Sequence, residues 1–148
     1  MIRVEQPPFD VGAELGAFGR NDIGIGAVAS FVGYVRGAEA GAPPLVALTL
    51  EHYPGMTERQ VEKIEAEAQL RWALTGTLVI HRYGRMLPGE PIVLVAAASS
   101  HRRAALEACE FLIDWLKTKA PFWKLEETAA GSAWVEAKAS DDAAADRW

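Results

Sequence analysis

The 148-residue sequence lacks the features that mark several classes of protein. It contains one cysteine, Cys109, so it cannot form an internal disulfide, which favours a reducing compartment. That cysteine and three dispersed histidines do not give the ligand spacing of a zinc site. The longest apolar run, residues 91–98, is too short to cross a bilayer, and the N-terminus has no apolar secretory segment. We therefore expect a cytoplasmic protein that binds neither zinc nor a membrane.

An excess of positive charge is also absent. The formal net charge is -5, from 15 Lys and Arg against 20 Asp and Glu, which argues against a general affinity for nucleic acid. Hydrophobic residues make up 50% and charged residues 24%, the composition of an ordinary globular domain. The length fits one domain over residues 1–148, and the composition indicates an enzyme or a binding domain without choosing between them.

The hydrophobic periodicity predicts an α+β fold. Apolar residues at helical spacing predict two main helices, at about residues 57–72 and 101–119, and a short N-terminal helix over residues 11–18. Strands outnumber helices and often follow one another, which favours a mixed or antiparallel sheet over a doubly wound one. Residues 37–44 are expected to form a loop, and the acidic tail, residues 140–148, is loosely specified. The expected strands are residues 2–5, 23–35, 45–52, 77–83, 91–98, 122–126 and 133–137.

The segment GIGAVA, residues 24–29, matches the G-x-G-x-x-A form of a dinucleotide-binding motif. Such a motif must follow a strand and open a helix, whereas here SFVGYVR continues as a strand. We therefore reject a nucleotide site and expect these glycines to permit a bend or close backbone packing.

The helix expected from residue 101 begins with positive charge. Ser99 or Ser100 is the expected N-cap, and His101, Arg102 and Arg103 fall in the first turn. Cations there oppose the helix dipole at a cost of about 0.3–1 kcal/mol. A bound phosphate or carboxylate would reverse the sign of that cost, but a salt bridge to a neighbouring acidic segment explains the cations equally well.

Lysines cluster at the other end of the same helix. Lys117 and Lys119 lie in its last turn, where cations are locally favourable and need no function. Lys124 follows in the apolar segment APFWKLE, on the same strand face as Phe122 and Glu126. A lysine partly removed from water there can act as a base or nucleophile, and a snorkelling side chain is an equal alternative. The residues alone thus predict an anion site and candidate lysines.

Six segments, taken together, resemble the large, catalytic subunit of molybdopterin synthase. The resemblance covers nearly the whole chain, in order and with compatible spacing, and its EHYPGM and LKTKAPFWK motifs are specific. The segments are FVGYVR (31–36), LTLEHYPGM (48–56), VIHRYGRMLPGE (79–90), SSHRRAALEA (99–108), DWLKTKAPFWKLE (114–126) and WVEAK (134–138).

The resemblance implies an α+β homodimer in which each copy binds one small, ubiquitin-like sulfur-carrier subunit, giving a heterotetramer. The carrier's C-terminal Gly-Gly, as a thiocarboxylate, would deliver sulfur to cyclic pyranopterin monophosphate and so form the dithiolene of molybdopterin. The resemblance also implies that the chain carries no metal or other cofactor of its own. The alternative is a non-enzymatic dimeric domain that binds a phosphorylated metabolite, in which the lysines would be replaceable.

The resemblance also implies site residues. Lys117 and Lys124 would be catalytic, and Arg36 would belong to the pocket for the anionic substrate. Gly37 stands where the family has asparagine, so the details of the following loop are not carried over. The remaining implied substrate-binding residues are His101, Arg102, Phe31 and Lys138, the last a lysine where the family pattern has arginine.

Overall fold

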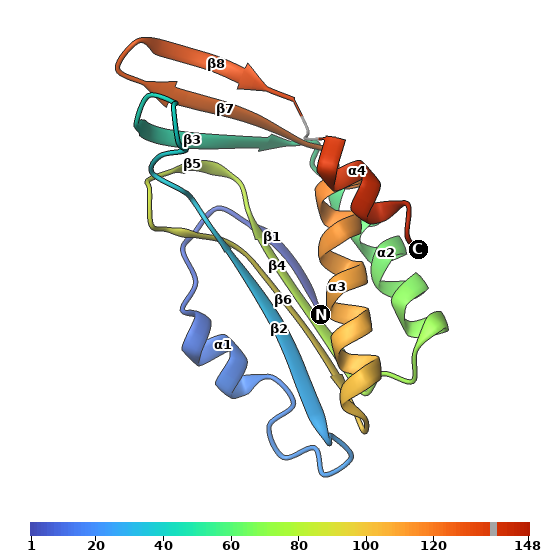
Figure 1. Ribbon diagram of the computed structural model, residues 1–148. Coiled ribbons are helices and arrows are strands. Elements are labelled where there is room, and N and C mark those ends of the chain that lie inside the picture. Colours follow the sequence, from blue (N-terminus) through green and yellow to red (C-terminus); the bar gives the residue numbers. More distant parts are fainter. Residues whose placement is uncertain (137–138) are drawn as a thin grey trace.

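The computed structural model of the protein describes residues 1–136 and 139–148 (Figure 1). Its helices are α1 (Val11–Ala17), α2 (Met56–Arg71), α3 (Arg102–Thr118) and α4 (Ala139–Ala145). Its strands are β1 (Ile2–Glu5), β2 (Ala27–Tyr34), β3 (Leu45–His52), β4 (Gly76–Arg82), β5 (Gly84–Met86), β6 (Pro91–Ser99), β7 (Phe122–Thr128) and β8 (Gly131–Val135).

The first sheet has the strand order β1-β4-β6-β2 and is mixed, because β1 runs parallel to β4 while the other pairs are antiparallel. β6 lies between β4 and β2, and residues 93–99 of β6 are all buried. An apolar run without alternation is typical of a strand covered on both faces, and residues 91–98 are the longest such run in the sequence.

The second sheet is antiparallel, in the order β5-β3-β7-β8, and lies at the end of the first sheet where α3 ends (Figure 1). A small cluster of Val35, Leu48, Leu50 and Met86 packs where the two sheets meet. The predicted α+β class is confirmed, with the strands divided between two sheets.

Helices cover both faces of the first sheet. α2 and α3 pack on one face and α1 packs on the other (Figure 1). Phe111 of α3 is fully buried, with its ring centroid 5.3 Å from those of Trp72 and Trp115 and 5.7 Å from that of Trp148. None of the helices in the described ranges is long and apolar enough to span a membrane.

The strand expected from residue 23 begins only at Ala27. Ile23 is fully exposed, and the N–H of Gly26 donates to the carbonyl of Ser99 at 3.0 Å. A Cβ atom on Gly26 would lie 2.2 Å from the carbonyl oxygen of Ser100, which no side chain tolerates. The expectation that a glycine of GIGAVA permits close backbone packing is therefore confirmed.

The C-terminal tail is more ordered than its composition predicts. α4 packs along α3, and the indole N–H of Trp148 donates to Asp114 at 2.9 Å. Arg147 donates to both Asp114 and Glu110, at 2.8 and 2.9 Å. These partners are more than 30 residues away in the chain, so no local pattern in the tail reveals them.

Candidate functional site

Two adjoining cavities lie where the last turn of α3 meets both sheets. The first has a volume of about 630 Å³ and the second about 460 Å³. Five residues line both of them, namely Arg36, Leu48, Ile92, Lys117 and Lys124. Three of the cations that the sequence singles out therefore meet at the junction of the two cavities.

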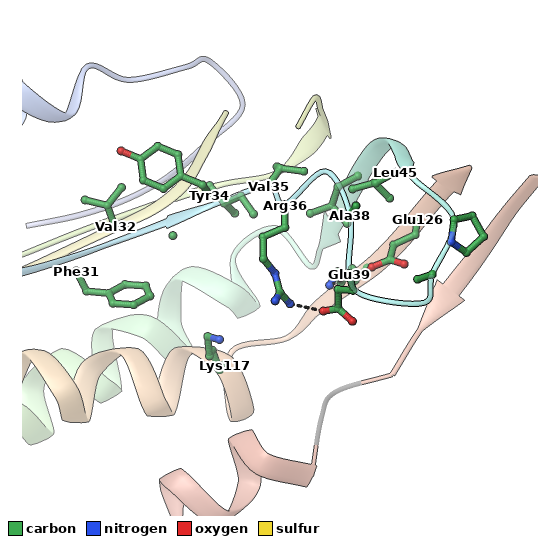
Figure 2. A pocket seen from close by; sticks show the side chains of 16 residues that line it. Phe31, Val32, Tyr34, Val35, Arg36, Ala38, Glu39, Leu45, Lys117 and Glu126 are labelled. Atoms are coloured by element: carbon green, nitrogen blue, oxygen red, sulfur yellow. Dashed lines mark hydrogen bonds and ion pairs between the residues drawn. The ribbon is translucent and has the colours of Figure 1, made fainter. Parts of the chain in front are cut away.

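Backbone pairing at the end of β2 directs Arg36 to this place. The N–H of Val35 donates to Glu90 at 2.9 Å, and its carbonyl accepts the N–H of Gly89 at 2.8 Å. Because both backbone groups of the preceding residue are fixed, Arg36 leaves the sheet in a defined direction. Figure 2 shows its side chain and the ring of Phe31 on the side of β2 that faces Lys117.

The two lysines come from different elements that the chain folds together. Lys117 lies in the last turn of α3, and Lys124 lies in β7, where it pairs with Leu50 of β3. Between them, the hydroxyl of Thr57 donates to the carbonyl of Pro121 at 3.3 Å and holds the turn. The side chains of Lys117 and Lys124 are 50% and 38% exposed, so both ammonium groups are accessible.

Each of these three cations has a carboxylate partner from the same chain. Arg36 forms an ion pair with Glu39 in the loop after β2 (Figure 2). Lys117 Nζ lies 3.8 Å from Asp141 Oδ1 of α4, and Lys124 Nζ lies 3.3 Å from Glu126 Oε1. Partly exposed ion pairs contribute only about 0–1 kcal/mol, so an incoming anion with better geometry can displace these carboxylates.

The comparisons with known proteins agree on one family. The profile of the MoaE protein family matches residues 4–119. The molybdopterin synthase catalytic subunit of Pseudomonas aeruginosa is 56% identical over 151 residues, covering 99% of this chain and 97% of the relative. The chain belongs to the MoaE family.

Solved structures extend this result to the fold. The molybdopterin biosynthesis MoaE protein of Burkholderia ambifaria superposes with a TM-score of 0.83 at 49% identity, covering 100% of this chain and 97% of that one. A complex of subunits 1 and 2 of molybdopterin-converting factor from Helicobacter pylori contains the same fold, with a TM-score of 0.76 at 24% identity over 91% of this chain and 90% of that one. The family and the Pseudomonas relative confirm the predicted function. The chain is a catalytic subunit of molybdopterin synthase, a sulfurtransferase of molybdenum cofactor biosynthesis. The non-enzymatic alternative is set aside.

Two of the predicted site residues of this MoaE-family chain lie far from the cavities. Arg102 and Lys117 are at opposite ends of α3, and a rise of 1.5 Å per residue separates their backbones by about 22 Å. His101 is the N-cap residue and, like Arg102, is exposed. One chain therefore does not bring this pair to Lys117. Lys138 lies outside the described residues.

The expected serine N-cap of α3 is wrong. Ser99 is buried, and its hydroxyl donates to the carbonyl of Ala73 at 2.8 Å. The N-cap residue is His101, and the helix begins after it. For Arg103 the salt-bridge explanation is correct, because its guanidinium donates to Glu107, one turn later, at 2.7 Å. No such pair is found for Arg102 among the described residues.

Several residues that line the cavities are not predicted from the sequence. Glu39 and Asp141 are in a loop and in the tail, where no periodic pattern marks them. For His81, by contrast, the sequence indicates a buried position, because alternation along β4 puts it on the same face as buried Val79.

His81 is a buried and neutral imidazole. The residue is 8% exposed, and its ring stacks on Phe122 with centroids 3.9 Å apart. Burial, with a smaller contribution from the nearby charge of His52, lowers the pKa of His81 to about 4. Its Nδ1 lies 3.0 Å from the carbonyl oxygen of Arg82, and because a carbonyl only accepts, Nδ1 carries the proton.

This burial makes stability depend on pH. The unfolded chain binds a proton at His81 near pH 6.5, whereas the folded chain resists it down to about pH 4. The free energy of unfolding is therefore highest above pH 6.5 and falls by roughly 3 kcal/mol as the pH is lowered through this window. Urea unfolding of wild type and His81→Gln between pH 4 and 7 measures it, and the variant should have the flatter profile. Parallel profiles would contradict this origin.

Proposed function

We propose that the chain transfers sulfur from the C-terminal thiocarboxylate of a small carrier protein to cyclic pyranopterin monophosphate, forming the dithiolene of molybdopterin. The convergence of Arg36, Lys117 and Lys124 at the junction of two cavities carries the proposal. Both reactants are anionic at the end that must be held, and two cavities that meet at shared cations suit two reactants.

The side chains suggest separate roles at the junction. Arg36 presents a planar fork of donors that suits a phosphate group. Lys117 would hold and orient the thiocarboxylate at the reacting carbon, and Lys124 would transfer the proton as oxygen leaves and sulfur arrives. Phe31, which is 36% exposed at the rim of the first cavity, would supply an aromatic surface beside the substrate. The basic residue at Lys138 would add a point charge.

We further propose that the carrier is a small ubiquitin-like subunit whose C-terminal Gly-Gly enters the cavities. Two copies of the catalytic chain and two carriers would form a heterotetramer. The Helicobacter pylori structure of the same fold is itself a complex of two subunits, which is consistent with this assembly. His101 and Arg102 would then serve the site of the neighbouring copy, because they lie at the far end of α3 from their own lysines.

A reconstituted reaction tests the proposed function. The chain is mixed with a thiocarboxylated carrier and cyclic pyranopterin monophosphate, and molybdopterin is measured as its fluorescent oxidised derivative. We expect product with the thiocarboxylated carrier and none with the same carrier ending in a carboxylate. Absence of product, with both reactants shown to be competent with another synthase, would contradict the proposal.

A further inference from the structure

The second cavity contains one buried group for which the proposed reaction has no role. His81 lines this cavity together with Lys117 and Lys124, at the place where β4 faces β7. The ring is held on two sides, by its stacking on Phe122 and by the hydrogen bond from Nδ1 to the carbonyl of Arg82. Its orientation is therefore fixed before any ligand binds.

The fixed tautomer gives His81 a definite chemical character. With the proton on Nδ1, the other nitrogen, Nε2, has a free lone pair and can only accept a hydrogen bond. Within the described part of the chain, no backbone or side-chain group donates to it. The low pKa of His81, about 4 because of burial, keeps this acceptor neutral at any physiological pH.

Such an acceptor is scarce in this cavity. The side chains of Arg36, Lys117 and Lys124 are donors only and can hold the anionic end of a reactant but none of its N–H groups. The acceptors among the other lining side chains are the carboxylates of Glu136 and Asp141 and the hydroxyl of Ser140, all near the C-terminal tail. Ser140 is exposed, so among the described residues that line this cavity His81 is the buried, uncharged side-chain acceptor.

We propose that His81 binds substrate, its Nε2 accepting a hydrogen bond from an N–H or O–H group of the reactant that fills the second cavity. This inference rests on the proposed function, because it takes one of the two reactants to be the ligand. The donor is either a peptide N–H of the carrier's Gly-Gly tail or a ring N–H of the pterin. Removing the acceptor leaves that donor buried without a partner, which weakens binding about tenfold.

Three variants separate the hydrogen bond from the shape of the ring. His81→Phe keeps a flat ring that can stack on Phe122 but has no acceptor. His81→Gln places an amide oxygen near the position of Nε2, and His81→Asn places the same amide near Nδ1 instead. Steady-state rates are measured with each reactant varied in turn while the other is saturating, after thermal unfolding has shown which variants fold.

We expect KM for one reactant to rise about tenfold in His81→Phe and His81→Asn, with a smaller change in kcat and a KM near wild type in His81→Gln. The reactant whose KM rises identifies the donor as peptide or pterin.

An unchanged KM for both reactants in His81→Phe would overturn the inference, and so would a His81→Gln variant no better than His81→Asn. If His81→Phe does not fold, the comparison of Gln with Asn decides. A wild-type chain without product would contradict the proposed function, whereas an active wild type with unchanged KM in the variants contradicts only the role of His81.

Discussion

Replacing Lys117 or Lys124 with alanine is expected to lower the rate of molybdopterin formation by about 10²–10⁴-fold, the usual loss when a proton-transfer or charge-stabilising group is removed. Both lysines line both cavities and are accessible from them. Stability should change little, since each side chain is partly exposed and its ion pair is weak. The rate is measured in the reconstituted reaction, and folding is checked by urea unfolding.

Lys119→Ala is the matched control for this pair. Lys119 closes the same helix as its C-cap residue and is exposed, but it lines neither cavity. Its replacement should leave the rate within about twofold of wild type, as for a surface charge away from the site. An equal loss in all three variants would mean that general positive charge, and no particular lysine, supports the reaction.

Arginine at the same positions distinguishes the two proposed roles. If Lys117 only orients an anion, Lys117→Arg should retain much of the activity, because arginine keeps the charge and adds donors. Lys124→Arg should remain nearly inactive, because a guanidinium does not give up its proton in a protein. The opposite order of activities would exchange the roles of the two lysines.

The sequence predicts the fold well where burial makes a local pattern. Helix α3 and strand β6 are found within one or two residues of their expected limits, because each buries a continuous apolar face. Prediction fails where a long-range contact determines the position or the limits of an element. α4 is held by partners on α3, and β2 begins late because Gly26 is packed against the backbone at Ser100.

The same distinction holds for the site. A family resemblance points to Lys117 and Lys124, and strand alternation places Lys124 beside Phe122 and Glu126. The ion pair between Lys117 and Asp141 has no such signal, because it joins a helix to a tail whose position depends on the rest of the core. Likewise, the tautomer of His81 is set by a carbonyl that happens to face Nδ1, which no side-chain pattern encodes.

Mixed dimers are expected to show that each site takes Arg102 from one chain and Lys117 from the other. The 22 Å or so between these positions along α3 cannot be spanned by an arginine side chain within one chain. A purified dimer of one Arg102→Ala chain and one Lys117→Ala chain then has one intact site out of two. Its rate should be about half that of wild type, although either variant alone is expected to lose more than 90% of activity.

The reciprocal arrangement provides the control. When one chain carries both substitutions and the other is wild type, sharing leaves each site with one missing group, so the dimer should be nearly inactive. If Arg102 instead served its own chain, the two arrangements would exchange results, and the dimer with a wild-type chain would retain half the activity. Both dimers hold the same number of altered residues, so a general loss of stability affects them equally. The contrast between them therefore reports only which chain supplies the arginine.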